Sequence, residues 1–224
     1  MKTVLITGID RGIGEALAEK FLKEQFFVIG TTLFENAPLS NNNLLVYKLD
    51  LSSGESIAVC SEEIIKSGKK IDILINLAGI NIDEDETKVV IEKLRKTLEV
   101  NLIGAIDFAE RIIPLVNKGG HIINISSTAG SLEMVDKGLS HNPYHYPSYK
   151  ISKVGINMYT RTLALRLKES DITVSSVHPG WVRTDIGGPD ADMSPEESAL
   201  GIYNIAISKP ETGQFWFKDE HVAW

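Results

Sequence analysis

The chain is poor in cysteine and has no long apolar run. Cys60 is the only cysteine among 224 residues, which excludes an internal disulfide and a metal site made of several cysteines. No apolar run approaches the roughly 20 residues that a membrane span requires, and the first residues, MKTVLITG, lack the apolar region and cleavage site of a signal peptide. We therefore expect a cytoplasmic protein with no membrane partner.

Basic residues are also scarce. The chain has 23 lysines and arginines against 30 aspartates and glutamates, a formal net charge of −7. Proteins that bind nucleic acids concentrate positive charge on one face, and no basic cluster of that kind occurs in the sequence, so we expect no nucleic-acid partner. The hydrophobic content of 43% is ordinary for a globular protein, and the length suits one continuous α/β domain spanning residues 1–224.

What the sequence does contain is a regular alternation of short apolar runs and longer segments of helical periodicity. The runs are residues 3–6, 26–29, 44–47, 71–75, 121–125 and 173–177, and a last strand is expected in TGQFWFKDEHVAW. The helical segments are residues 14–23, 56–65, 92–116, 152–167 and 195–207, with Pro114 expected to end or bend the third. Short runs rich in valine and isoleucine are typical of strands buried on both faces of a parallel sheet. The alternation predicts a single-domain α/β fold with a Rossmann-type, doubly wound parallel sheet.

The first apolar run leads directly into a glycine-rich turn, TGIDRGIG, and then into a helix. Such a turn lets the backbone approach a pyrophosphate and directs the unpaired N–H groups of the helix start at it. Its glycines are Gly8, Gly12 and Gly14, a spacing that is wider at the first interval than in the general dinucleotide fingerprint. By itself this spacing is also compatible with a tight turn that needs only the conformational freedom of glycine.

Three more segments extend the pattern over nearly the whole chain. NLAG covers Asn76 to Gly79, KLDLS contains Asp50, and HPGWVRTD covers residues 178–185. Together with the glycine turn they resemble the short-chain dehydrogenase/reductase family, and most strongly its small carbonyl reductases related to the C-factor and Sniffer proteins. The second position of NLAG departs from the family, which has asparagine where this chain has Leu77.

The resemblance implies that a nicotinamide dinucleotide is the cofactor. The residues that it places on the cofactor are Gly8, Asp10, Arg11, Gly12, Ile13, Gly14, Thr32, Asp50, Leu51, Asn76, Ala78, Gly79, Tyr149, Lys153, Pro179, Gly180, Val182 and Thr184. Arg11 resembles an arginine that NADP-dependent members carry in this turn, which favours NADP(H) over NAD(H). Thr32 and Leu33 at the end of the second strand are uninformative. Glu35 is the argument for NAD(H), because an acidic residue there repels a 2′-phosphate.

A tyrosine lies four positions before a lysine twice in the stretch YHYPSYKISK. Tyr146 precedes Pro147, which disfavours a helical conformation. Tyr146 and Lys150 are therefore not expected to share a helical turn, and their spacing is interpreted as accidental. Pro147 suits a helix start, and it places Tyr149 and Lys153 on one face of that helix.

The two lysines are expected on different faces of this helix. Lys153 shares a stripe with Ile156, Thr160, Leu163 and Leu167, and Lys150 lines up with Asn157, Arg161 and Lys168. We therefore expect Lys153 to point inward and Lys150 to point to water. The family pattern of tyrosine, two residues, serine and lysine agrees with Tyr149, Ser152 and Lys153.

The resemblance implies four catalytic residues, Asn101, Ser127, Tyr149 and Lys153. Ser127, the second serine of NISSTAG, follows the fifth strand, where doubly wound sheets place their ligands, whereas Ser126 is expected to face the core or cap a loop. Tyr149 would exchange a proton with a carbonyl or alcohol oxygen, and the Lys153 ammonium would lower the pKa of this tyrosine from about 10. Ser127 would fix the angle of the carbonyl oxygen, and Asn101 would support a water-mediated proton path.

These residues favour an oxidoreductase that transfers a hydride between the nicotinamide and a small-molecule carbonyl or alcohol substrate, most simply a carbonyl reductase. Two other functions stay open: a catalytically silent dinucleotide-binding sensor or interaction module, and an epimerase or dehydratase of the family's longer, extended branch. We expect no metal site, because His141 and His145 have no carboxylates at a recognisable spacing. The resemblance also implies a homodimer or homotetramer, and the long segment 131–147 is expected to reshape the substrate entrance.

Overall fold

One mostly parallel β-sheet forms the centre of the molecule. The computed structural model describes residues 1–34, 39–135 and 144–224. Within these residues the sheet has the strand order β3-β2-β1-β4-β5-β6-β7-β8. The strands are β1 (Thr3–Ile6), β2 (Phe27–Thr32), β3 (Leu44–Lys48), β4 (Ile71–Asn76), β5 (Val116–Ile125), β6 (Thr173–Val177), β7 (Gln214–Phe217) and β8 (Glu220–His221). β1 to β7 pair in parallel and β8 runs antiparallel to β7, so the predicted doubly wound parallel sheet is confirmed.

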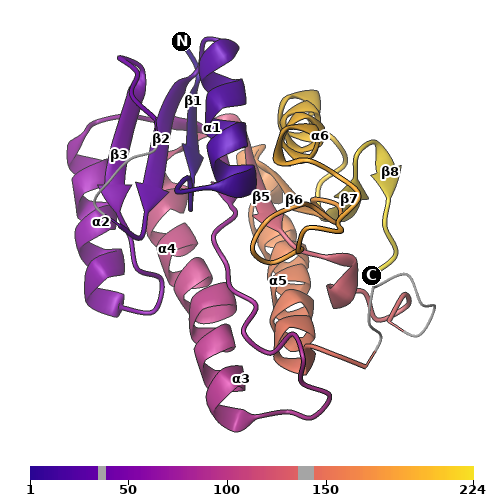
Figure 1. The fold of residues 1–224 in the computed structure, drawn as a ribbon. Helices are drawn as coiled ribbons and strands as arrows, with labels where there is room; N and C mark the ends of the chain where they lie inside the picture. Colours follow the sequence, from indigo (N-terminus) through magenta and orange to yellow (C-terminus); the bar gives the residue numbers. More distant parts are fainter. Residues whose placement is uncertain (35–38, 136–143) are drawn as a thin grey trace.

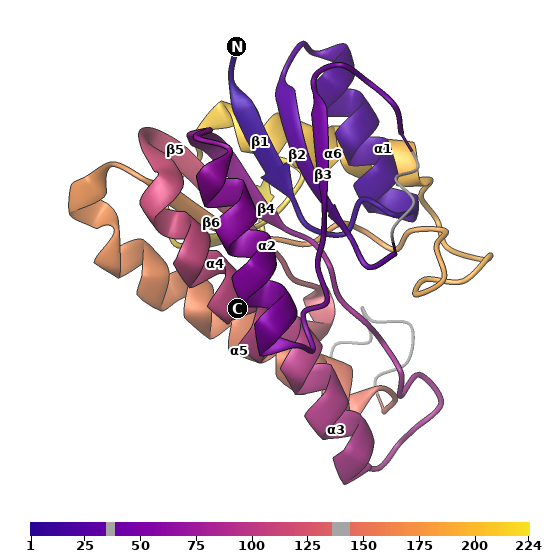
Figure 2. The same cartoon turned by 90° about the vertical axis from the view of Figure 1, so that its left-hand side faces the viewer.

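Helices cover both faces of the sheet (Figure 1). They are α1 (Gly12–Lys23), α2 (Gly54–Lys66), α3 (Ile91–Leu98), α4 (Ala105–Ile112), α5 (Pro147–Arg166) and α6 (Pro195–Ser208). Figure 2 shows α1 and α6 on one face and α2, α4 and α5 on the other. This layering leaves the carboxyl ends of the parallel strands as the edge at which such folds bind ligands. In the part of the chain that the structure describes, no helix is both long and apolar enough to cross a lipid bilayer.

Strand residues alternate between two hydrophobic cores, one on each face of the sheet. In β1, Val4 and Ile6 belong to the core beneath α1 and α6, whereas Leu5 belongs to the core beneath α2, α4 and α5. All three side chains are fully buried. A strand that is buried on both faces presents no side to water, which explains why the sequence has continuous apolar runs here instead of an alternating pattern.

The helix that the sequence predicts over residues 92–116 forms over residues 91–115, but it is not a regular α-helix throughout. α3 is followed by a π-helical turn over Glu99–Gly104, by α4, and by a 3-10 turn over Ile113–Leu115 that contains Pro114. A Cβ atom at Gly104 would collide with the carbonyl oxygen of Leu51, so only glycine permits this close approach of two backbones. Val116, expected in the helix, begins β5.

α5 begins at Pro147, in line with the expectation for this proline. Tyr146 lies just before the helix with φ 48° and ψ 53°, outside the right-handed helical region. Lys153 faces the core as predicted, with 5% of its surface exposed. Two expectations are wrong. Asn157 is buried and donates a hydrogen bond to a backbone carbonyl at 3.0 Å, and the half-buried Lys150 places Nζ 4.7 Å from the ring centroid of Tyr146. The spacing of Tyr146 and Lys150 thus produces a cation–π contact.

Candidate active site

The predicted site residues follow the carboxyl ends of four neighbouring strands. The glycine turn follows β1, NLAG spans the end of β4 and the residues after it, Ser127 follows β5, and HPG follows β6. β1, β4, β5 and β6 are adjacent in the sheet, so these segments converge at one edge. This is the edge at which open α/β sheets bind their ligands.

The glycine turn has the shape of a phosphate cradle. Gly8 and Gly12 have φ angles of 75° and 57°, which favour glycine, and a Cβ atom at Gly14 would collide with the Gly8 carbonyl oxygen. A Cβ atom at Gly12 would lie 3.1 Å from the methyl group of Thr184. The turn therefore presents bare backbone toward the segment that contains Thr184, and its residues fit a dinucleotide whose pyrophosphate lies at the start of α1.

Thr7 joins two of the predicted cofactor segments, and the sequence reasoning missed it. Its Oγ1 atom accepts hydrogen bonds from the backbone N–H groups of Leu77 at 2.9 Å and Ala78 at 3.1 Å. The Cα and Cβ atoms of Ala78 lie close to Gly8, at 3.1 and 3.0 Å from the position of a Cβ on that glycine. The only signal in the sequence is a threonine between an apolar strand and the first glycine. Leu77, which departs from the family pattern, packs against the core beneath α1 and α6.

Two charged residues of the glycine turn have partners at the rim of the site. The Asp10 carboxylate accepts a hydrogen bond from the backbone N–H of Leu33 at 3.0 Å, just after β2. Arg11 forms an ion pair with Asp185 at 2.8 Å, and both side chains are largely exposed, at 73% and 69%. The Thr32 hydroxyl donates to a backbone carbonyl at 2.7 Å, so it is engaged locally. Glu35, the residue that argued for NAD(H), lies outside the described residues.

Several predicted cofactor residues turn their side chains away from the edge of the sheet. Leu51 and Val182 are buried, Ile13 packs against the core, and Asn76 donates from Nδ2 to the Asn124 Oδ1 atom at 2.8 Å. Such residues have mainly backbone atoms to offer a cofactor.

The other predicted cofactor residues shape the backbone at the rim of the site. Asp50 accepts hydrogen bonds from the N–H and the hydroxyl of Ser52 at 2.8 and 2.6 Å. After β6, Gly180 has φ 90°, and the Pro179 carbonyl accepts a hydrogen bond from the Ser198 hydroxyl at 2.6 Å.

Ser127 and Tyr149 are hydrogen-bonded through their side chains. Burial raises the pKa of Tyr149 to about 12, and the hydrogen bond with Ser127 acts in the opposite direction. The expectation of a lowered tyrosine pKa is therefore not met, because the cost of burying a phenolate outweighs the hydrogen bond. Ser127 also accepts a hydrogen bond from the backbone N–H of Ala129 at 3.1 Å, which holds its side chain at the end of β5.

Lys153 lies beneath Tyr149. Its Nζ atom is 5.4 Å from the centroid of the Tyr149 ring and donates a hydrogen bond to the carbonyl of Ile125 at 2.8 Å. Burial lowers the pKa of this lysine to about 8, so its ammonium is easier to deprotonate than one in water. Ser126, as expected, is buried, with its hydroxyl 3.4 Å from the Lys153 carbonyl.

Asn101 closes the back of the cluster. It lies in the π-helical turn, with 2% of its surface exposed. Its Oδ1 atom accepts from the N–H of Ile80 and its Nδ2 atom donates to the Ile80 carbonyl, both at 2.8 Å, and Nδ2 also donates to the Ser152 hydroxyl at 3.2 Å. A Cβ atom at Gly79 would lie 3.1 Å from Asn101 Oδ1 and 3.9 Å from Lys153 Nζ. Asn101 and Lys153 thus both lie close to Gly79, and Ser127 and Tyr149 form a second pair beside them.

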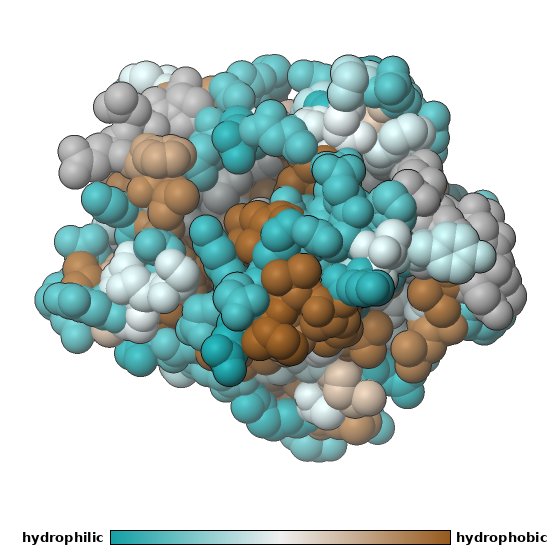
Figure 3. All heavy atoms as spheres, turned by 60° about the horizontal axis from the view of Figure 1, so that its bottom comes forward, coloured by the Kyte–Doolittle hydropathy of each residue, from teal (hydrophilic) through white to brown (hydrophobic). Residues whose placement is uncertain are grey.

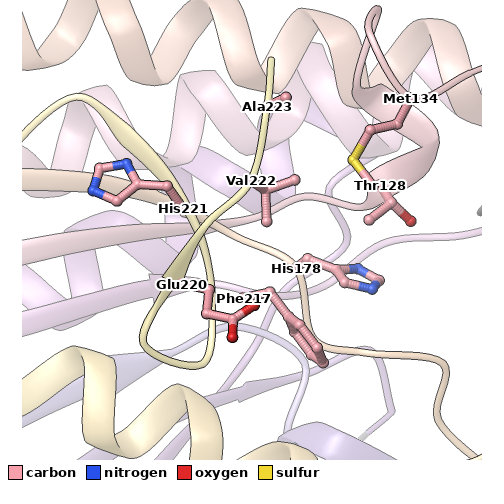
Figure 4. Close-up of a pocket in the computed structure, with 8 residues that line it drawn as sticks. All are labelled: Thr128, Met134, His178, Phe217, Glu220, His221, Val222 and Ala223. Carbon is pink, nitrogen blue, oxygen red and sulfur yellow. The ribbon is translucent and has the colours of Figure 1, made fainter.

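A pocket of about 350 Å³ is lined in part by residues that are next to predicted site residues in the sequence (Figure 4). It is lined by Thr128, Met134, His178, Phe217, Glu220, His221, Val222 and Ala223. Thr128 directly follows Ser127, and His178 directly precedes Pro179. The rings of His178 and Phe217 pack with centroids 5.0 Å apart. The pocket therefore combines apolar side chains with two imidazoles, one carboxylate and one hydroxyl.

No group of three or more metal-ligating side chains occurs in residues 1–34, 39–135 or 144–224. The Nδ1 atom of His145 is 3.0 Å from the carbonyl of Glu84, and Tyr144 is exposed. His141 lies outside the described residues, as do the other residues of 136–143, within the segment 131–147 whose effect on the substrate entrance was predicted.

Comparisons with known proteins agree with this geometry. Residues 2–194 match the family described as short chain dehydrogenase. The 1-hydroxy-2-glutathionyl-2-methyl-3-butene dehydrogenase of Rhodococcus sp. (strain AD45) is 30% identical over 98% of this chain and 97% of its own, and carbonyl reductase [NADPH] 1 of Mus musculus is 26% identical over 94% of each. A short-chain dehydrogenase/reductase from Burkholderia multivorans, solved with bound NADP, superposes with a TM-score of 0.88 at 28% identity, covering 100% of this chain and 99% of its own. The carbonyl reductase Sniffer of D. melanogaster gives 0.85 at 26%, covering both chains fully. The chain belongs to the short-chain dehydrogenase/reductase family.

Proposed function

We propose that the protein is an NADP(H)-dependent carbonyl reductase that uses Tyr149 as its proton donor. The observation that carries the proposal is the grouping of Tyr149 with the Ser127 side chain and the buried Lys153, whose Nζ atom lies 5.4 Å from the centroid of the Tyr149 ring. This group lies at the carboxyl edge of the sheet, where the glycine cradle also opens. A dinucleotide-binding module without catalysis would not need a buried lysine and a hydrogen-bonded phenol at this edge.

When bound, the cofactor supplies a hydride to the carbonyl carbon of the substrate. Tyr149 donates its proton to the carbonyl oxygen, and Ser127 hydrogen-bonds the same oxygen and sets its angle. The raised pKa of Tyr149 keeps the phenol protonated at neutral pH, which is the form that a proton donor requires. Lys153 stabilises the phenolate that remains after proton transfer. Asn101 holds the backbone of Ile80 next to Lys153 and maintains the route by which the proton is replaced.

NADP(H) is preferred over NAD(H) in this proposal. Arg11 is exposed at the edge of the glycine cradle, so its guanidinium is accessible to a 2′-phosphate. The names of the relatives point the same way, because the Burkholderia multivorans structure contains NADP and the mouse carbonyl reductase is named for NADPH. The cofactor-binding residues in this proposal are those predicted from the sequence. Leu51, Asn76 and Val182 are buried and would contact the cofactor mainly through backbone atoms.

The substrate is proposed to occupy the pocket of Figure 4. Its lining begins one residue after Ser127, and its apolar wall of Met134, Phe217 and Val222 suits the non-reacting part of a small aldehyde or ketone. His178 follows β6 directly and contributes a polar imidazole to the lining of the pocket.

We further propose that residues 1–224 form one domain that assembles in the cytoplasm as a homodimer or homotetramer. One sheet runs from β3 to β8 and incorporates strands from both ends of the chain, which supports a single domain. Apolar surface is present on the face that lies at the bottom of Figure 1 (Figure 3). Exposed apolar side chains on α3, the π-helical turn and α5 are Ile91, Ile103, Ile151, Met158 and Leu165. Burying them between subunits would remove this surface from water, and analytical ultracentrifugation measures the assembly directly.

The proposed activity is tested by mixing the purified protein with NADPH, or separately with NADH, and with a panel of small aldehydes, ketones and diketones. Loss of nicotinamide absorbance that requires a carbonyl compound and is faster with NADPH is the expected result. Tight cofactor binding with no turnover across the panel, or faster turnover with NADH, contradicts the proposal in its activity or in its cofactor preference.

A further inference from the structure

The start of α5 is held by a segment that precedes it by about 60 residues in the sequence. Residues 83–86, here called the 83–86 clamp, contact three consecutive parts of the chain entering the helix. Asp83 Oδ2 accepts a hydrogen bond from the backbone N–H of Ser148 at 2.6 Å, and the Glu86 carbonyl accepts one from the N–H of Tyr146 at 3.0 Å. The Glu84 carbonyl lies 3.0 Å from His145 Nδ1.

The helix needs this outside partner because it lacks an ordinary cap. The first N–H groups of a helix have no partner within it and are usually satisfied by a serine, threonine, aspartate or asparagine at the cap position. The cap residue of α5 is Tyr146, whose side chain makes no capping hydrogen bond, and Pro147 has no N–H. Asp83 supplies the missing acceptor, and its negative charge lies at the positive end of the helix dipole.

Asp83 is not a surface cap. Only 1% of its surface is exposed, and Ser148 is fully buried. Within the described residues, the second carboxylate oxygen, Oδ1, has no hydrogen-bond partner. Burying a carboxylate is costly unless hydrogen bonds or nearby positive charge compensate for the lost water. Burial lowers the pKa of the half-buried Lys150, and the negative charge of Asp83 opposes that shift only in part.

The clamp continues a strip of chain that contacts the catalytic group at several points. Gly79 lies beside Lys153 Nζ and Asn101 Oδ1, Ile80 exchanges two hydrogen bonds with Asn101, and Asp83 holds Ser148, the residue before Tyr149. The strip therefore fixes the helix start relative to the π-helical turn. A shift of the first turn of α5 would move the Tyr149 hydroxyl relative to Ser127.

We propose that Asp83 is a positioning residue for the reaction: through its hydrogen bond to the Ser148 N–H, it sets the first turn of α5 so that Tyr149 meets Ser127. The inference rests on the proposed carbonyl reductase function. Asp83 touches neither substrate nor cofactor in this scheme. It acts through the backbone that places Tyr149, and small misplacements of a catalytic group cost rate without a matching loss of binding.

The test compares three variants by steady-state kinetics, NADPH binding and hydrogen–deuterium exchange. Asp83→Leu keeps the branched shape of the side chain and removes the acceptor, and Asp83→Asn keeps an oxygen that can accept from Ser148. Asp85→Asn is the matched control on the same segment, where Asp85 is exposed. We expect Asp83→Leu to lower kcat by about tenfold or more, with KM and the NADPH dissociation constant within about twofold. Exchange should rise in the first turn of α5 and not in α1 or α6, and Asp83→Asn should recover kcat to within about threefold of the wild type.

Two kinetic outcomes would overturn the proposal: a kcat of Asp83→Leu equal to that of Asp85→Asn, or a loss of kcat without faster exchange at the start of α5. If Asp83→Leu does not fold, Asp83→Ala replaces it. Failure of both variants to fold would also overturn the proposal, because Asp83 would then be a stability residue. The exchange measurement needs neither substrate nor cofactor. A wild-type protein that reduces no carbonyl compound would therefore defeat the proposed function, while the exchange data would still decide whether Asp83 orders the start of α5.

Discussion

The ammonium of Lys153 lies 5.4 Å from the ring centroid of Tyr149, yet the pKa of this tyrosine is raised to about 12. Burial explains the direction, because it disfavours the charged form of each side chain: the tyrosine pKa rises and the lysine pKa falls to about 8. The resulting pair is a protonated phenol above a lysine that is charged at neutral pH. In the direction of carbonyl reduction, this is the protonation state that can donate a proton and stabilise the phenolate left behind.

Removing the phenol hydroxyl is expected to stop the reaction. Tyr149→Phe should lower kcat by roughly 1000-fold, the size of effect that a general acid provides, while the NADPH dissociation constant changes by less than about twofold. Tyr146→Phe is the control, since Tyr146 lies just before the helix and contacts Lys150 instead. Activity that survives in Tyr149→Phe and disappears in Tyr146→Phe would assign the acid to the other tyrosine.

Two adjacent serines offer a second matched pair. Ser127→Ala removes the hydrogen bond to Tyr149 and should lower kcat by roughly 100-fold, because one precisely placed donor at the reacting oxygen is lost. Ser126→Ala removes only a buried hydroxyl 3.4 Å from a backbone carbonyl, so kcat should stay within about threefold of the wild type. Equal effects of the two substitutions would argue against a role for Ser127 at the carbonyl oxygen.

Arg11 and Asp185 should control the choice of dinucleotide. Arg11→Gln is expected to weaken NADPH binding by about tenfold and NADH binding by less than about twofold, because only NADPH carries the 2′-phosphate. Asp185→Asn should strengthen NADPH binding by a few-fold at most, since it removes an exposed competitor for the guanidinium. Isothermal titration with both cofactors gives the ratios, with Asp190→Asn on the same loop as the control. Equal losses for NADPH and NADH in Arg11→Gln would remove Arg11 as the discriminating residue.

His121 makes the stability of the fold sensitive to acid. The imidazole is buried between Ser175 and the carbonyl of Ala206, and burial lowers its pKa from 6.5 to about 4. Between these values the unfolded chain binds the proton and the folded chain does not, so the free energy of unfolding should fall as the pH is lowered from about 6.5 to 4. The loss amounts to about 3 kcal/mol at roughly 1.4 kcal/mol per pKa unit.

Denaturant titrations across this pH range measure the effect. His121→Gln should flatten the dependence on pH, whereas His221→Gln, at an exposed histidine, should leave it as in the wild type. A variant without His121 that still loses the same stability between pH 6.5 and 4 would assign the effect to other groups.

The sheet could be predicted because its strands are buried on both faces. Val4, Leu5 and Ile6 form one continuous apolar run, and the observed strands start and end within a few residues of the predicted runs. The helix predicted over residues 92–116 could not be predicted in detail. It contains a π-helical turn that ends at Gly104, where the backbone approaches Leu51, about 50 positions away, and helical periodicity contains no sign of such a contact.

The proposed catalytic residues could be predicted from local sequence patterns, but the residues that position them could not. Tyr149 and Lys153 are separated by one helical turn, and this spacing is visible in the sequence. Asp83 and Thr7 act across 65 and about 70 positions, so no short motif identifies them. The raised pKa of Tyr149 could not be predicted either. Burial decides the direction of the shift, and the sequence alone does not show how deeply a residue near a helix start is buried.

The most direct test of the central claim follows the hydride itself. NADPH carrying deuterium at the transferable position of the nicotinamide is incubated with the protein and a carbonyl compound identified from the panel, and the alcohol is examined by mass spectrometry and NMR. The wild-type protein should place one deuterium on the carbinol carbon, and Tyr149→Phe should give almost no labelled alcohol while still binding the cofactor. Consumption of NADPH without deuterated alcohol, or full label transfer by Tyr149→Phe, would contradict the assignment of this protein as a carbonyl reductase with Tyr149 as its acid.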